Sequence, residues 1–231
     1  MLPMPVLVLG FSGSGKSTSI RNLDPEETFL INCGDKVLPF KNGPNLYTEF
    51  NKEKNPNGNM LTTDSYPEIM KFIKGVSEQK KNISNIVIDD SQALIINEFM
   101  SKHKTNNKGN EVFALYNDIA YNFYTLLKES KKLRNDLFIF FLHHAEMTDN
   151  GMIQPKTMGK LLNDKIDIPS NFTVVLFAVR EGKRNYFLTQ NDGTTPAKTP
   201  EGMFNEDKID NCLQFVKESI TQYFKGENDN V

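Results

Sequence analysis

The chain has 231 residues, of which 38% are hydrophobic, and its formal net charge is −2. This length suffices for one sizeable domain with a buried core, and the near-neutral charge argues against a global basic field for nucleic acid. The two cysteines, Cys33 and Cys212, lie far apart and predict thiols in a reducing compartment rather than a disulfide framework. The start lacks the features of a signal peptide, and no apolar run approaches the ~18 residues of a membrane helix, so we expect a cytoplasmic protein.

Residues 10–17 fit the P-loop pattern G-x-x-x-x-G-K-[ST] without a mismatch. The apolar run from Val6 to Leu9 predicts a buried strand leading into the loop, and a short helix is expected at 16–23. Loop glycines permit backbone angles at which successive N–H groups curl around phosphate oxygens, and the helix N-terminus adds a favourable dipole. The predicted nucleotide-binding residues are Gly10, Ser12, Gly13, Ser14, Gly15, Lys16, Ser17 and Thr18.

The remaining elements follow as short apolar runs alternating with amphipathic stretches. Strands are predicted at 28–32, 85–90, 137–142, 173–179 and 185–189. Helices are predicted at 66–79, 91–102, 111–132, 158–164 and 208–224. We expect a surface elaboration at 36–64, a small hairpin around an Asn-Gly pair at 150–151, a loop at 192–200 and a polar tail at 226–231.

Strands separated by helices predict a mostly parallel sheet with helices on both faces. The fold class is therefore α/β, organised as one domain over residues 1–231, with the strands at 173–179 and 185–189 forming a C-terminal antiparallel hairpin. Ligands of such sheets bind beyond the carboxyl ends of the strands. That rule places the P-loop, Asp35, Asp89, Asp90 and His143 along one rim.

The P-loop pattern gives two side chains roles of their own. Lys16 is expected to reach the β- and γ-phosphates, and the Ser17 hydroxyl to ligate Mg²⁺. Asp89 ends the apolar run 86–88 and fits a Walker B strand, whose carboxylate would hold Mg²⁺ from the side opposite Ser17. Ser17 and Asp89 are therefore the predicted metal ligands.

Hydrolysis also needs a group that orients or deprotonates water, and two candidates remain open. Asp90 follows Asp89 directly, but adjacent strand residues point to opposite faces, so Asp90 could instead cap the next helix. Asp35 follows the second predicted strand. His143 and His144, after the strand at 137–142, are candidate sensors of the γ-phosphate or ordinary hydrogen-bonded side chains.

Several cations lie late in the chain or in polar segments. Arg180, Lys183, Arg184 and Lys198 form either a solvated basic patch or a finger that enters a neighbouring subunit's nucleotide site. The basic loop at 102–110 is expected to be solvated rather than to contact DNA. On the long helix that follows, the face beginning at Phe113 is expected to belong to the core.

The order of four blocks adds a resemblance. After the P-loop come the segments 88–94 (IDDSQAL) with 97–100, 142–146 (LHHAE) and 196–204 (PAKTPEGMF). Together they resemble the small RecA-core ATPases of tailed phages, often called phage nucleotide-binding proteins or Sak-type single-strand annealing recombinases. The resemblance covers nearly the whole chain, although only the P-loop is highly specific.

This resemblance implies a RecA-type core that binds ATP and Mg²⁺, forms homo-oligomers and acts on single-stranded DNA in phage recombination, with a single-strand-binding or replication protein as a possible partner. It assigns Lys16 and Ser17 to Walker A, Asp89 to Walker B, the His143 region to γ-phosphate sensing, and Lys198 to a cation presented across a subunit interface. RecA-like enzymes place a Glu after the second strand, whereas this chain reads Asn32-Cys33-Gly34-Asp35. Slow hydrolysis, or substitution by Asp35 or Asp90, would follow.

Three other functions remain open from the sequence. A helicase-loader-like or partner-remodelling ATPase would use the same nucleotide site, as would a non-hydrolysing nucleotide switch. A nucleotide or small-molecule kinase usually closes an Arg-rich lid on the phosphates. Arginine occurs here only at positions 21, 134, 180 and 184, which disfavours a kinase.

Overall fold

The structure is a computed structural model that describes residues 4–103 and 109–225. The expected polar tail at 226–231 lies outside the described residues, as do Lys104 and Lys108 of the expected basic loop. The strands are β1 (Met4–Gly10), β2 (Thr28–Asn32), β3 (Met60–Thr62), β4 (Asn85–Asp89), β5 (Phe138–Met147), β6 (Ile153–Pro155), β7 (Val174–Glu181), β8 (Arg184–Leu188) and β9 (Lys208–Asp210). The helices are η1 (Ser17–Asn22), α1 (Gly43–Leu46), α2 (Tyr66–Gln79), α3 (Gln92–Lys102), α4 (Asn110–Ser130), α5 (Lys160–Asn163), η2 (Pro169–Asn171) and α6 (Leu213–Lys225), of which η1 and η2 are 3₁₀ helices.

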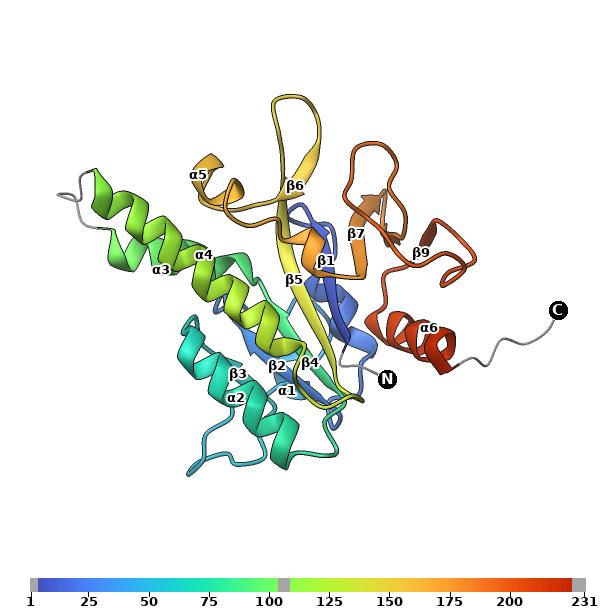
Figure 1. Cartoon of the computed structure of the whole chain (residues 1–231). Helices are drawn as coiled ribbons and strands as arrows, with labels where there is room; N and C mark the ends of the chain where they lie inside the picture. Colours follow the sequence, from blue (N-terminus) through green and yellow to red (C-terminus); the bar gives the residue numbers. More distant parts are fainter. Residues whose placement is uncertain (1–3, 104–108, 226–231) are drawn as a thin grey trace.

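The strands form one sheet in the order β3-β2-β4-β5-β1-β7-β8-β9, and β6 pairs with the end of β5 (Figure 1). All pairs from β3 across to β7 are parallel, whereas β8, β9 and β6 join antiparallel. The predicted α/β class is confirmed, with its mostly parallel sheet and C-terminal antiparallel hairpin. One strand, β5, lies between the P-loop strand β1 and the Walker B strand β4.

Helices cover both faces of the sheet, as expected. The helices α2, α3 and α4 lie on one side in Figure 1, and η1 and α6 lie on the other. In β5, Ile139 and Phe141 belong to the first core, whereas Phe138, Phe140 and Leu142 belong to the second. This alternation buries β5 on both faces, which explains why the central strands read as continuous apolar runs.

Two elements differ from the sequence prediction. β5 continues past its expected end at 142 to Met147, because β6 pairs with its last residues and satisfies their backbone groups. The expected helix at 208–224 begins only at Leu213, and β9 precedes it. Buried Ile209 of β9 lies four residues before buried Leu213, a helical spacing that leads the sequence pattern to predict a start one turn too early for α6.

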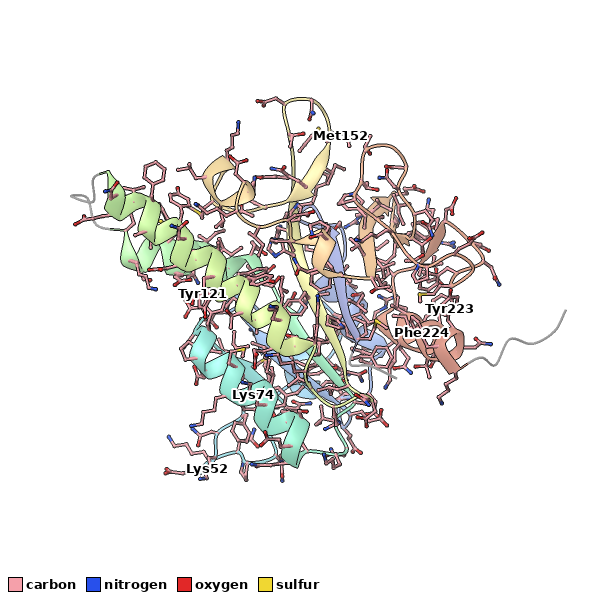
Figure 2. All side chains as sticks on the ribbon, viewed as in Figure 1. Lys52, Lys74, Tyr121, Met152, Tyr223 and Phe224 are labelled. Atoms are coloured by element: carbon pink, nitrogen blue, oxygen red, sulfur yellow. The ribbon has the colours of Figure 1, made fainter. Side chains whose placement is uncertain are left out.

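The segment 36–64 is more integrated than a surface elaboration. It contributes the edge strand β3, and Tyr47 is only 1% exposed. The face of α4 that packs into the core is also shorter than predicted, because Phe113 near its start is 51% exposed while Phe123 is buried. Figure 2 shows Tyr121, which is 68% exposed, on the outer side of the same helix. Within the described residues, no helix is both long enough and apolar enough to cross a membrane.

Candidate nucleotide-binding site

The loop after β1 has the geometry of a phosphate cradle. Gly13 and Gly15 have φ of 76° and 95°, in the left-handed region that glycine adopts without strain. A Cβ on Gly15 would lie 2.6 Å from the Asn185 side chain, so β8 packs directly against the loop. Among the described residues, no acceptor meets the N–H groups of Gly13, Gly15 and Lys16. Successive unpaired backbone amides in such a loop can serve as the donors that a phosphate requires.

Two further polar atoms beside the loop lack a partner within residues 4–103 and 109–225. They are the buried Ser14 Oγ and Asn185 Oδ1. Because buried polar groups are almost always hydrogen-bonded in folded proteins, these orphaned atoms fit a loop that a polar ligand completes.

Lys16 is folded back over the loop. Its Nζ donates to the carbonyl oxygens of Gly10 (2.8 Å) and Phe11 (3.0 Å), and the residue is only 5% exposed. An ammonium group has three protons, so one donor remains for a ligand. Burial lowers the pKa of Lys16 to about 8, although the charges of Asp90 and Asp89 oppose this shift. A phosphate would restore the favourable charge environment that burial removes.

The structure brings together Ser17 and Asp89, the two residues expected to hold a metal. The Ser17 hydroxyl donates to Asp89 Oδ1 at 2.9 Å, although 72 residues separate them in the chain. Asp89 is 5% exposed, and burial together with the Asp90 charge raises its pKa to about 6. A hydroxyl and a buried carboxylate form an oxygen donor set that suits Mg²⁺. The residues present therefore fit this metal.

Asp90 does not cap α3, because Ser91 occupies the cap position and no side-chain cap bond forms there. Its backbone adopts φ of 57°, and its carboxylate contacts two partners, Lys36 and His144. Oδ2 binds Lys36 Nζ, and Oδ1 lies 3.1 Å from His144 Nε2. Burial raises the pKa of Asp90, but hydrogen bonds from His144 and Lys36 outweigh this effect and hold the pKa well below its usual range.

His143 is fully buried inside β5 rather than exposed at a strand end. Its Nε2 lies 2.9 Å from the Lys156 carbonyl, which can only accept, so Nε2 carries the proton. Its Nδ1 lies 2.9 Å from Ser91 Oγ, and burial lowers the pKa of the ring to about 4. Both ring nitrogens are therefore engaged, and His144 is the histidine that contacts the acidic pair.

The structure does not bring every predicted residue into this cluster. Asp35 is exposed and has φ of 47°. Lys198 is exposed and its backbone pairs with Val175, which lies three residues before Ala178, the β7 partner of Gly10. Its side chain lines a separate cavity of about 450 Å³. Arg180, Lys183 and Arg184 are exposed at the β7–β8 turn, and β7 continues beyond the register of Gly10.

Sequence reasoning missed three residues that shape the site: Lys36, Asn32 and Asn185. Lys36 looks like an ordinary loop lysine after a strand, and no local pattern links it to Asp90. Asn185 begins a strand and gives no signal that it packs on Gly15. Asn32, which ends β2, offers a hint about the turn that holds Lys36, because asparagine side chains often hydrogen-bond the backbone of a following turn.

The fold and the site together define a P-loop nucleotide-binding domain. Residues 2–200, which are most of the chain, match a family model described as an AAA domain. The chain therefore belongs to the AAA domain family, a family of nucleotide-binding ATPase type. No curated protein matches the chain.

Proposed function

We propose that this protein is a Mg²⁺-dependent ATPase that acts on single-stranded DNA in phage recombination or strand annealing, and that it assembles as a homo-oligomer. The observation that carries the ATPase part is the contact between Ser17 and Asp89 beside the buried Lys16. Lys16 offers a donor for the β- and γ-phosphates, and Ser17 and Asp89 offer the oxygens that would hold Mg²⁺. Bound Mg²⁺ would neutralise phosphate charge.

The DNA part rests on the resemblance of the four sequence blocks and on one feature of the surface. Arg180, Lys183 and Arg184 are exposed at the end of a hairpin whose next residue, Asn185, contacts the P-loop. Cations in this position suit a polyphosphate backbone or a neighbouring subunit's nucleotide. Either contact would act on the P-loop through the packing of Asn185 against Gly15. Lys198 stays a proposed interface cation on the basis of the resemblance alone.

The site also supports slow hydrolysis. Of the proposed water-activating residues, Asp90 has both oxygens engaged and a depressed pKa, which makes a weak general base, and Asp35 is exposed. The second candidate function, a nucleotide switch that binds without turnover, is favoured by the same observation. Turnover therefore decides between the two.

The test is ATP hydrolysis with and without single-stranded DNA, together with binding of a fluorescent ATP analogue, in wild type and Lys16→Ala. We expect slow turnover that DNA stimulates, and a loss of affinity of roughly 100-fold in the variant, because losing one partner of a buried charge pair costs about 2–5 kcal/mol. Lys52→Ala, on an exposed loop, is the matched control.

Each other outcome selects a different function. Stimulation only by a partner protein would indicate a loader or remodelling ATPase, and phosphate transfer to a nucleotide would indicate a kinase. Binding without turnover under any condition would indicate the switch. Unchanged affinity in Lys16→Ala would contradict the site itself.

A further inference from the structure

A second lysine contacts the acidic pair beside the P-loop. The Nζ of Lys36 binds Oδ2 of Asp90, whose backbone N–H in turn donates to Asp89 Oδ1 at 3.0 Å. The charge of Lys36 contributes to lowering the pKa of Lys16, so the two ammonium groups are close enough to repel each other. Two like charges near one site are stabilised when an anion binds between them.

The backbone of Lys36 is fixed in place, whereas its side chain is largely exposed apart from the contact with Asp90. The Asn32 side chain accepts from the Lys36 N–H at 3.2 Å and donates to the Lys36 carbonyl at 3.0 Å. The start of the same turn is joined to β4, because the Cys33 N–H donates to the Asp89 carbonyl at 3.1 Å. The Lys36 side chain itself is 63% exposed. The loop therefore fixes the backbone from which this exposed cation extends at the end of β2.

Asp90 orients this cation. Its left-handed backbone is unfavourable for a residue other than glycine, and such strain is concentrated at functional sites. Gly34 makes room for the carboxylate, because a Cβ there would lie 2.6 Å from Asp90 Oδ2. Thus two neighbouring segments, the turn after β2 and the end of β4, share the task of placing one ammonium group.

We propose that Lys36 binds the terminal phosphate of a nucleoside triphosphate and thereby lets this protein distinguish ATP from ADP. This inference rests on the proposed nucleotide function and adds to it. Lys16 approaches from the P-loop and Lys36 from the β2 side, and such paired cations stabilise charge on a transferring phosphoryl group.

The test compares the affinities of ADP and of a non-hydrolysable ATP analogue by calorimetry in wild type, Lys36→Gln and Lys36→Arg. We expect Lys36→Gln to bind the ATP analogue about tenfold more weakly and ADP as wild type does, because one hydrogen bond to a charged group is lost. Lys36→Arg should keep most of the preference for ATP. Lys52→Gln is the control, and Figure 2 shows Lys52 at the opposite end of the molecule from Met152 of the β5–β6 hairpin.

A double variant separates phosphate contact from simple neutralisation of Asp90. If Lys36 only offsets the Asp90 charge, Asp90→Asn combined with Lys36→Gln restores the preference for ATP and overturns the inference. If Lys36 touches the phosphate, the double variant stays deficient. If Lys36→Gln loses affinity for ATP and ADP equally, or loses none, the inference about Lys36 is overturned while the proposed function stands. A wild-type chain that binds neither nucleotide overturns the proposed function and the inference with it.

Discussion

At the scale of single residues, two adjacent carboxylates have opposite properties. Asp89 faces the Ser17 hydroxyl in a buried environment, where burial and the Asp90 charge raise its pKa to about 6. Asp90 contacts Lys36 and His144, and these partners depress its pKa. The two neighbours are therefore suited to different tasks, a metal ligand for Asp89 and an orienting anion for Asp90.

His143 gives a prediction at the same scale. The unfolded ring titrates near 6.5 and the folded ring near 4, so the unfolded state binds more protons between these values. The free energy of unfolding therefore falls as the pH drops from 6.5 towards 4, and His143 contributes about 3 kcal/mol of that loss. We expect urea unfolding of His143→Gln at pH 7.5 and 4.5 to show a smaller loss on acidification than wild type.

The comparison of variant with wild type isolates this contribution. The raised pKa of Asp89 acts with the opposite sign between 3.8 and 6, because there the folded state binds more protons, and it is present in both proteins. An identical loss of stability on acidification in both proteins would show that His143 is not held neutral by burial.

At the scale of elements, the contact between β8 and the P-loop can be tested by substitution. Gly15→Ala places a Cβ at φ of 95° and 2.6 Å from Asn185, so we expect a loss of roughly 1–3 kcal/mol of stability and weaker nucleotide binding. Adding Asn185→Ala should recover part of the loss, with a coupling energy of about 0.5–3 kcal/mol in urea unfolding.

Gly75→Ala is the matched control for this cycle. Gly75 lies within α2 and has no atom within 4 Å of its added Cβ. Because alanine favours helix over glycine, this change should stabilise the protein by about 0.5–1 kcal/mol. Strict additivity of Gly15→Ala and Asn185→Ala would mean that the hairpin does not support the loop.

The elements also show which parts of the site a sequence can reveal. Strand β1, the loop glycines and Asp89 follow from local patterns, since an apolar run and glycine spacing fix their geometry. The Lys36–Asp90 pair could not be predicted, because it depends on a left-handed backbone at Asp90 and a turn held by Asn32. The sequence predicts that His143 follows the end of a strand, whereas it lies inside β5. The strand is longer than predicted because β6 pairs with its last residues, and the local sequence does not reveal this pairing.

At the scale of the whole molecule, two cores share one sheet. The strands β1, β4 and β5 contribute side chains to both, so opening one face exposes the other. The site lies on the carboxyl ends of these same strands, and β5 lies between β1, which leads to the loop of Ser17, and β4, which ends in Asp89. A ligand that joins them stabilises the shared sheet, and unfolding should remain a single transition.

This coupling makes ligand-dependent stability a test of the metal site. A nucleotide that binds only the folded state at 100 times its Kd adds about 2.7 kcal/mol to the free energy of unfolding. We expect a non-hydrolysable ATP analogue to stabilise wild type more with Mg²⁺ than with a chelator. Asp89→Asn keeps an oxygen near the Ser17 hydroxyl but loses the charge, so it should retain the metal-independent part and lose the Mg²⁺ increment. An increment that survives in Asp89→Asn would place the metal on other ligands and separate the Walker B strand from its expected role.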